Sequence, residues 1–204
     1  FAAIADRPLK PLETVDLSKY DNLEKIDMKI EDELCQRYSC IKLDNITKNV
    51  SPVNMRIRLF YCGMRGINLL ADLTNYLMLE MGQPMHAFDG TKVQSIGVGM
   101  GENGTKFTTL DGTERDVDEN TLLILNNNEP VAVAGIMGGL DSEIVGDKDS
   151  VVLESANFDG VCVRKTSSRM GLRTDASARY EKILDPEITV TAIRRFVKLL
   201  KEID

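Results

Sequence analysis

The chain has 204 residues, of which 43% are hydrophobic and 28% are charged, as is ordinary for a soluble globular protein with a core of its own. The formal net charge of −7 argues against nucleic-acid binding by bulk attraction, although it is compatible with a local basic surface. The apolar runs are too short to span a membrane, and four cysteines without a CxxC pair, together with one histidine, do not supply the usual zinc ligands. We therefore expect a cytoplasmic protein with reduced thiols, no metal site and no membrane segment.

The first segment, FAAIADRPLKPLETVD, is polar, contains prolines and begins with Phe instead of Met. Such a composition is typical of a linker. We expect residues 1–20 to connect a preceding domain to a folded unit over residues 21–204, and the chain to be a piece of a longer protein.

Two helices are predicted in the first half of this unit, after a strand formed by YSCIKL. The first helix, VNMRIRLFYC, is expected to have Ser51 as N-cap and Pro52 at its first position, and to end near Gly63. The second, INLLADLTNYLMLEM, is expected to end at Gly82 because Pro84 prevents its continuation. Its apolar residues recur at helical spacing and predict one buried face, formed by Leu69, Leu70, Leu73, Leu77 and Met81.

Between residues 93 and 154 the pattern predicts short strands separated by turn residues: VQSIGVGM, KFTTL, RDVD, TLLIL, PVAVAGIM and SVVLES. Asp111-Gly112 indicates a hairpin turn, since glycine permits the positive φ that tight hairpin turns need. GMGENG, residues 99–104, matches the GxGxxG dinucleotide fingerprint. It leads into a strand and not into a helix N-terminus, so a turn between strands is the favoured interpretation.

The last third is predicted to be helical again. Asp159 is a candidate N-cap for a helix through VCVRKTSSRM that ends at Gly171. A second helix is expected over DASARYEKIL, and Asp185-Pro186 begins a third, whose apolar stripe consists of Ile193, Phe196, Val197, Leu200 and Ile203. Helices, then a block of strands, then helices indicate the α+β class: one compact module with a central, largely antiparallel or mixed β-sheet flanked by helices.

The single histidine, His86, follows a Gly-Gln-Pro turn in EMGQPMHAFDG. A lone histidine beside Met85 and Phe88 is more often a packed, half-buried residue than a catalyst, by about two to one. No Ser or Cys nucleophile with a paired base accompanies it, so a triad hydrolase has little support. The residues alone leave the role of His86 open.

Two further segments are candidates for a binding site. Glu154 in VVLESANF is a carboxylate in an otherwise apolar strand, so it either faces solvent or accepts a hydrogen bond from a specific donor. Alternation is compatible with solvent, but it also places Glu154 on a partly apolar face with Val152 and Ala156. AVAGIMGG, residues 132–139, ends an apolar strand with small residues, which either let a ligand approach the backbone or form a crowded turn.

The segment RKTSSRMGLRTDASARYEK is locally basic within an acidic chain. Such a run is usually a solvated helical face. A weak RNA contact is the alternative, because arginine suits bidentate phosphate contacts. The candidate RNA-binding residues are Arg164, Arg169, Arg173 and Arg179.

Taken together, these segments resemble the β chain of bacterial phenylalanyl-tRNA synthetase. The similar pieces are ADLTNYLMLEMGQPMHAFD, TLDGT, AVAGIMGG, VLESANF and RKTSSRMGLRTDASARYE, in the order of the family, over roughly residues 30–190. The resemblance implies an editing module that hydrolyses tyrosine wrongly esterified to phenylalanine tRNA, within a larger ligase. It implies no cofactor in this segment, ATP and magnesium for the parent enzyme, and as partners the mischarged tRNA, the other β-chain domains and a synthetase α chain in an α2β2 assembly.

The resemblance also implies roles for individual residues. Glu154 becomes the acceptor for the tyrosine hydroxyl, and His86 and Asn75 become the catalytic residues that position the ester, the ribose or the attacking water. Met170 and Ala178 stand where many bacterial relatives have histidines, so a mechanism that needs those histidines does not apply to this chain. The alternatives are a non-catalytic RNA-binding or scaffold module of the same fold and, with least support, an unrelated small-molecule hydrolase. The other substrate-binding positions that the resemblance implies are Thr74, Ala134, Gly135, Thr174 and Ala176.

Overall fold

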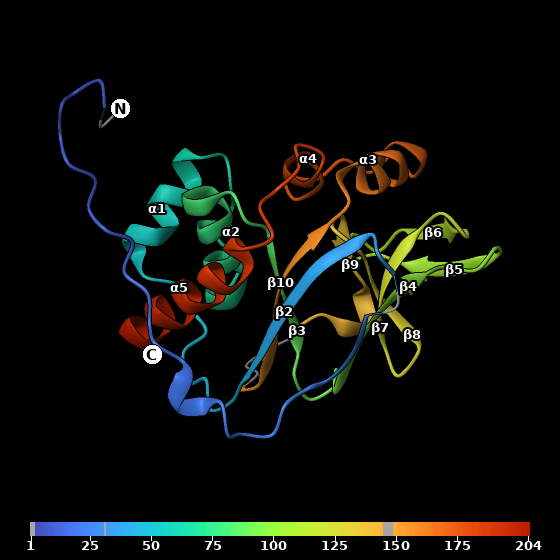
Figure 1. Cartoon of the computed structure of the whole chain (residues 1–204), viewed down its shortest axis with the longest axis horizontal. Coiled ribbons are helices and arrows are strands. Elements are labelled where there is room, and N and C mark those ends of the chain that lie inside the picture. Colours follow the sequence, from blue (N-terminus) through green and yellow to red (C-terminus); the bar gives the residue numbers. More distant parts are fainter. Residues whose placement is uncertain (1–2, 31, 145–148) are drawn as a thin grey trace.

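A computed structural model of the chain describes residues 3–30, 32–144 and 149–204 (Figure 1). The described strands form three sheets. An antiparallel sheet has the order β2–β10–β3, in which β10 lies between its two neighbours. A second sheet has the order β1–β4–β7–β8–β9, with β1 parallel to β4 and the other pairs antiparallel. The bounds of these strands are β1 (Asp27–Ile30), β2 (Cys35–Leu43), β3 (Met85–Asp89), β4 (Ser95–Met100), β7 (Leu122–Asn126), β8 (Glu129–Val133), β9 (Met137–Gly138) and β10 (Val151–Phe158).

The third sheet is a hairpin of β5 (Thr105–Thr108) and β6 (Glu114–Val117), which projects from the rest of the molecule (Figure 1). Helices cover only part of this framework. The helices of one group, α1 (Val53–Tyr61), α2 (Leu69–Met81) and α5 (Ile188–Ile203), pack on one face of the three-stranded sheet. The other group, α3 (Gly160–Arg169) and the single turn α4 (Ser177–Tyr180), lies near one end of β10. The short 3-10 turns are η1 (Ser18–Tyr20) and η2 (Leu140–Ser142).

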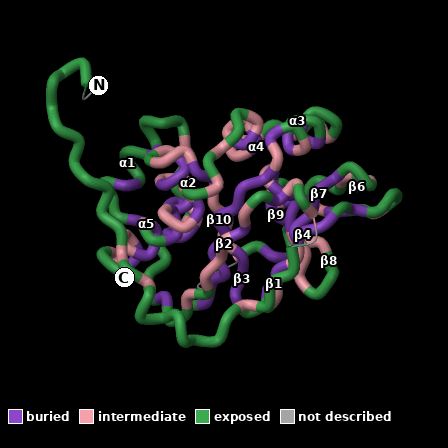
Figure 2. Tube along the Cα trace, in the orientation of Figure 1, coloured by how far each residue is buried: buried purple, intermediate pink, exposed green. Residues whose placement is uncertain are grey.

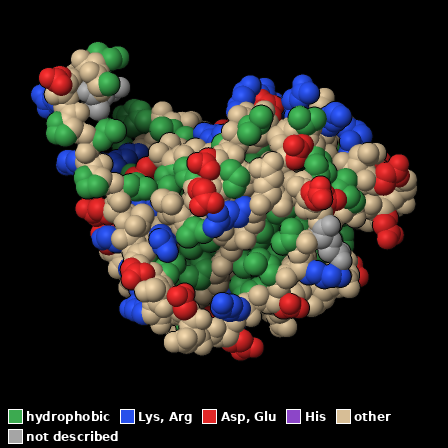
Figure 3. All heavy atoms as spheres, viewed as in Figure 1, with side chains coloured by type: hydrophobic (Ala, Val, Ile, Leu, Met, Phe, Trp, Pro, Cys, Tyr) green, Lys and Arg blue, Asp and Glu red, His purple; other side chains and the backbone are tan. Residues whose placement is uncertain are grey.

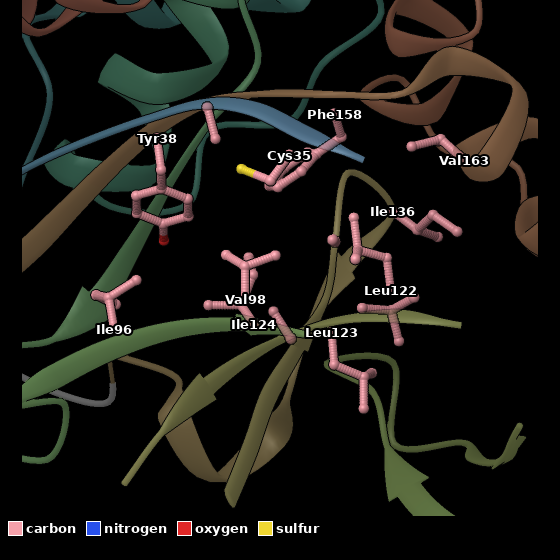
Figure 4. Packing of buried hydrophobic residues seen from close by; sticks show 14 of the residues in the cluster. Cys35, Tyr38, Ile96, Val98, Leu122, Leu123, Ile124, Ile136, Phe158 and Val163 are labelled. Atoms are coloured by element: carbon pink, nitrogen blue, oxygen red, sulfur yellow. The ribbon is translucent and has the colours of Figure 1, made fainter. Parts of the chain in front are cut away.

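Strand β10 is buried along its whole length because both faces of its sheet are covered (Figure 2). Val151 and Leu153 pack against the helices α1, α2 and α5 in one core. Val152, Ala156 and Phe158 belong to a second core, shared with the five-stranded sheet. Figure 4 shows Phe158 in this core together with Val98 and Ile124. The α+β class is therefore confirmed, with two facing sheets in place of the one central sheet that the pattern suggested.

Several predicted helix ends are confirmed because their signals are local. Helix α2 ends at Gly82, which adopts φ 78°, and the side chain of Asp159 caps α3 by accepting from the Cys162 N–H at 2.7 Å. The predicted N-cap Ser51 is wrong: α1 begins at Val53, and the Ser51 hydroxyl donates to the buried carboxylate of Asp72 at 2.6 Å. A buried carboxylate needs such donors, so tertiary contact overrides the local capping preference.

The strand predictions needed more correction. Strands β1 and β3 were not predicted, and the expected strand PVAVAGIM is split into β8 and β9 by a turn at residues 134–136, where Gly135 adopts φ 70°. The helix expected over residues 175–184 shortens to α4, and Ile183 lies at a positive φ of 62°. The segment GMGENG is a turn between β4 and β5 as expected, and Gly112 in the β5–β6 hairpin has φ 75°.

Residues 3–17 contain no helix or strand, and part of this segment lies along α5. The Glu13 carbonyl accepts from Arg195 Nη1 at 2.9 Å, and the Val15 N–H donates to the Arg194 carbonyl at 3.4 Å. Within the described parts of the chain, no helix has both the length and the apolar character needed to cross a membrane.

Candidate functional site

A cavity of about 70 Å³ lies between the two larger sheets, near the start of β3 and the turn after β8. Such a volume accommodates several water molecules. Its walls are mostly apolar or backbone, with Ile124, Val133 and Met137 from the five-stranded sheet. Two titratable side chains line it from the three-stranded sheet: His86 and Glu154.

Strand pairing brings His86 and Glu154 together. In the antiparallel β3–β10 pair, His86 lies directly opposite Glu154, so the two side chains stand on the same face of the sheet. The turn before β3 is fixed by Gln83, which is fully buried and whose Nε2 donates to the carbonyls of Pro84 and Ala156, both at 2.9 Å. The Gly-Gln-Pro turn therefore sets the position from which His86 faces the cavity.

Glu154 is only 4% exposed, which excludes the solvent-facing alternative. The Tyr38 hydroxyl donates to its Oε2 at 2.7 Å. Burial raises the pKa of Glu154 from 4.5 to about 7, and the hydrogen bond from Tyr38 acts in the opposite direction. Within the described parts of the chain, Tyr38 is the hydrogen-bond donor to this carboxylate, and Glu154 lines the cavity.

The imidazole of His86 is held by packing. It meets the ring of Phe88 edge-on, with 4.5 Å between centroids. It also lies against Gly138, where an added Cβ would come within 2.6 Å of the His86 ring atoms Cε1 and Nε2. The residue as a whole is half-buried, but Nε2 is enclosed and has no hydrogen-bond partner among the described residues. Burial lowers the pKa of His86 from 6.5 to about 4, so the ring is neutral at pH 7.

The backbone of Gly135 also borders the cavity. Gly135 lines the cavity in the turn between β8 and β9, and its N–H donates to no other described residue, although the N–H groups of Ala134 and Ile136 on either side are bonded. Buried polar groups are usually paired, so the enclosed Nε2 of His86, which has no partner among the described residues, marks this cavity as a candidate site. A ligand in the cavity would therefore meet the backbone of Gly135, the imidazole of His86 and the carboxylate of Glu154.

The structure brings some of the predicted site residues together and leaves others apart. Gly135 and Ala176 line the cavity with His86 and Glu154, and Ala134 is buried next to them. Thr174 is not in the lining, but its hydroxyl donates to the Ile136 carbonyl at 3.0 Å and so ties the segment before α4 to the cavity wall.

Thr74 and Asn75 do not line the cavity. They lie on α2, which packs on the opposite face of the three-stranded sheet from His86. The Thr74 hydroxyl donates to the Ala71 carbonyl of its own helix at 2.8 Å. A direct contact of these two residues with a ligand in this cavity therefore has no geometric basis here.

Sequence reasoning missed two tyrosines of the site. Tyr38 is bonded to Glu154, and Tyr180 lines the cavity and donates to the Ala156 carbonyl at 3.0 Å. YSCIKL was recognised as a strand, but nothing in the sequence pairs that strand with β10. The register of β2 against β10 brings Tyr38 close to Glu154, because Tyr38 lies opposite Ala156 in this pair. That register cannot be read from the sequence.

Lys and Arg side chains gather over α3 and α4 on the molecular surface (Figure 3). Three of the four candidate arginines are already ion-paired: Arg169 with Asp118 at 2.9 Å, Arg173 with Glu181 at 2.6 Å and Arg179 with Asp175 at 3.2 Å. Arg164 is exposed and has no ion pair within the described ranges. Over the same ranges no group of three or more His, Cys, Asp or Glu residues is arranged to hold a metal ion.

Comparison with known proteins shows the family of the chain. The model of the B3/4 domain matches residues 34–204. The chain belongs to the B3/4 domain family. The chain is 44% identical to the phenylalanine–tRNA ligase β subunit of Clostridium acetobutylicum over 183 residues, which cover 89% of this chain and 23% of that protein. It is 48% identical to the same subunit of Carboxydothermus hydrogenoformans over 157 residues, which cover 76% of this chain and 20% of that protein.

The chain is thus a region of the phenylalanine–tRNA ligase β-subunit type, and it spans about a fifth to a quarter of the length of these relatives. Among solved structures, an N-terminal fragment of the phenylalanyl-tRNA synthetase β-subunit from Pyrococcus horikoshii matches with a TM-score of 0.49 and 10% sequence identity. That match covers 72% of this chain and 50% of the other chain.

Proposed function

We propose that this B3/4 segment is the editing module of a phenylalanine–tRNA ligase and hydrolyses the ester that joins tyrosine to phenylalanine tRNA. The observation that carries the proposal is the buried carboxylate of Glu154, which lines an apolar cavity and already accepts a hydrogen bond from one phenol, that of Tyr38. The hydroxyl of a bound tyrosine would make the same kind of contact with Oε1. Phenylalanine, in contrast, would enclose that oxygen without giving it a partner.

The chemical need for such a site follows from the size of the discrimination. A hydrophobic pocket rejects an added hydroxyl by only about a hundredfold. A site built to hydrogen-bond the hydroxyl instead rejects the analogue without it by about 10⁴-fold to 10⁵-fold, because buried polar groups are then left unpaired. A second pocket around Glu154 would therefore capture the tyrosyl error and release the correct phenylalanyl ester.

The cavity is small for an aromatic side chain. An apolar cavity that binds benzene has about 150 Å³, roughly twice the 70 Å³ between the sheets here. The lining includes Met137, whose unbranched, flexible side chain can turn aside to admit a larger group. Substrate entry is thus expected to move Met137.

In the proposed reaction, water attacks the carbonyl carbon of the ester, the bond to the ribose oxygen breaks, and free tyrosine and a ribose hydroxyl result. His86 is neutral and its Nε2 lacks a partner, so it can hold that water or the terminal ribose. A base with a pKa of about 4 abstracts protons poorly at pH 7. Positioning is therefore its proposed contribution. Asn75, on the far side of the sheet, would act only after a rearrangement of α2.

The proposal extends to the setting of the reaction. The parent enzyme would be a cytoplasmic α2β2 ligase that uses ATP and magnesium for aminoacylation, with residues 1–20 of this chain as the connection to a preceding domain. Arg164 is the best-placed of the four candidate arginines to contact the tRNA backbone, since it is exposed and carries no ion pair to another described residue. Phosphate contacts of this kind position the RNA without reading its sequence.

The experiment uses the full-length ligase that contains this segment and phenylalanine tRNA charged with tyrosine. Glu154→Ala should remove the preference for the tyrosyl ester over the phenylalanyl ester, and His86→Ala should lower the deacylation rate. Glu143→Ala, which removes an exposed carboxylate, serves as the matched control, and phenylalanylation by each preparation reports folding. Unchanged deacylation in both variants would show that the pocket assignment is wrong. Binding of the mischarged tRNA without hydrolysis by the wild type would favour the non-catalytic RNA-binding alternative.

A further inference from the structure

The hydrogen bond between Tyr38 and Glu154 lies behind the cavity, since Glu154 lines the cavity and Tyr38 does not. Tyr38 projects from β2 into the space between the two sheets (Figure 4). Only 8% of it is exposed, and its ring meets that of Phe158 edge-on with 6.4 Å between centroids. Because Tyr38 lies opposite Ala156 in the β2–β10 pair, it is the diagonal neighbour of Glu154 on the same face of the sheet.

We propose that Tyr38 is a specificity-determining positioning residue: its hydroxyl holds Oε2 of Glu154 so that Oε1 faces the cavity and receives the phenol of the misattached tyrosine. The inference rests on the proposed editing function and identifies the residue that prepares its acceptor. Tyr38 acts through Glu154 and does not itself touch the substrate.

The first step of the argument is geometric. A carboxylate rotates readily about its last torsion, and that torsion is broad and two-fold. A hydrogen bond of 2.7 Å from a packed tyrosine to one oxygen fixes the plane of the group and therefore the direction of the other oxygen. A preorganised acceptor loses less freedom when the substrate binds, and this favours the ligand that can donate to it.

The second step concerns the charge of Glu154. Burial favours its neutral form, and the hydrogen bond from Tyr38 is the one influence on its pKa that favours the carboxylate. No cation of the described residues offsets the burial. The other titratable groups near Glu154 are neutral at pH 7. Burial raises the pKa of the thiols of Cys35 and Cys40 and of the phenol of Tyr180, and it lowers the pKa of the imidazole of His86. Loss of the Tyr38 hydroxyl would therefore leave Glu154 protonated over more of the physiological range.

The third step links charge to discrimination. A hydrogen bond to an ionised acceptor is roughly twice as strong as one between neutral groups. A tyrosyl ester benefits from this difference and a phenylalanyl ester does not. Tyr38→Phe should therefore lower the preference for the tyrosyl ester about tenfold at pH 7, as expected for a difference of about 1.4 kcal/mol.

The test measures deacylation of tyrosyl and phenylalanyl esters of phenylalanine tRNA by the full-length ligase as a function of pH. Tyr38→Phe keeps the ring and removes only the hydroxyl, so the packing with Phe158 remains. The KM for the tyrosyl ester should rise more than kcat changes, and the pH at which KM begins to rise on acidification should move upward. Tyr76→Phe, which removes a hydroxyl on α2 away from the cavity, should leave KM for the tyrosyl ester and its pH dependence unchanged.

A second variant separates positioning from general destabilisation. In a Glu154→Gln background residue 154 carries no charge, so adding Tyr38→Phe should not further change the pH dependence of KM for the tyrosyl ester. If Tyr38→Phe alters neither the pH profile nor the ester preference of an active wild-type enzyme, Tyr38 has no positioning role and the editing proposal still stands. If the wild-type ligase does not deacylate the tyrosyl ester at all, both proposals fail.

Discussion

Replacement of Glu154 by glutamine should change how the stability of the chain depends on pH. The carboxyl of Glu154 has a pKa of about 7 when folded, against 4.5 for an exposed group, because burial penalises its charge. The folded state therefore holds this proton more tightly than the unfolded state. Stability from this group is fully present below pH 4.5 and is lost as the pH rises through about 7, and the loss amounts to about 3 kcal/mol. A glutamine at this position has no proton to lose.

His86 works in the opposite direction. Burial lowers its pKa from 6.5 to about 4, so the folded state binds the proton less tightly than the unfolded state. Stability from this group is present above pH 6.5 and is lost as the pH falls through about 4, again by about 3 kcal/mol. In the wild type the two contributions nearly cancel between pH 4.5 and 6.5. Glu154→Gln removes one of them and should expose the other, so that the variant gains stability as the pH rises.

The assay is urea unfolding followed by circular dichroism, since the chain has no tryptophan to report by fluorescence. The free energy of unfolding of the wild type is subtracted from that of the variant at each pH, which cancels the contributions of all other groups. This difference should shift in favour of Glu154→Gln by about 3 kcal/mol between pH 4.5 and 7. Glu143→Gln, which changes an exposed carboxylate, should give a difference that does not vary with pH. A flat difference for Glu154→Gln as well would refute the inference that its carboxyl is enclosed and penalised by burial.

Three further predictions test the cavity, the core and the basic surface. Gly138→Ala should lower deacylation by the full-length ligase about a hundredfold, because the added methyl group would displace the imidazole of His86, which lies 2.6 Å from the Cβ position. Leu73→Ala, which removes a fully buried side chain of α2, should lower the free energy of unfolding by roughly 2–5 kcal/mol, measured in urea. Arg164→Ala should weaken tRNA binding and reduce the slope of log K against log salt by about 1, whereas Arg169→Ala should have a smaller effect because its guanidinium is already bound to Asp118.

Matched control variants separate the predicted effects from those of substitution in general. Gly66→Ala adds the same methyl group where the nearest neighbours are 3.4 Å away, and it should leave deacylation unchanged. An active Gly138→Ala variant would mean that His86 has no fixed position in the reaction. For the core, Val53→Ala truncates an exposed apolar residue and should cost less than 1 kcal/mol. Equal effects of the two arginine variants on tRNA binding would contradict the inference that ion pairing withholds Arg169.

The sequence by itself determined the features whose causes lie within a few residues. Gly82 ends α2 because a left-handed residue without a side chain completes the helix there, and Asp159 begins α3 because its carboxylate reaches the N–H of Cys162. The hairpin at Gly112 follows from the same local freedom. The α+β class also followed from pattern, since helical and strand periodicities occupy separate parts of the chain.

Predictions from local sequence signals were wrong where a residue distant in the sequence provides a more favourable contact. Ser51 has the chemistry of an N-cap, yet its hydroxyl donates to Asp72, because a buried carboxylate left without donors costs more than a missing cap. Strand β3 carries no clear alternation of its own, and it forms because β10 provides a partner for its backbone groups. The strand expected over residues 130–137 breaks at Gly135, where an added Cβ would approach Tyr180 and Val163 to 3.0 Å.

The candidate site shows the same division. The sequence identified His86 and Glu154 as unusual residues and, through the family resemblance, as members of one pocket. Only the tertiary structure decided that they lie opposite each other on neighbouring strands, that Tyr38 holds one oxygen of Glu154, and that Thr74 lies across the sheet from them. The physical reason is that a residue's type fixes which hydrogen bonds and charges it can offer, whereas strand order and register, which depend on the whole core, fix what it meets.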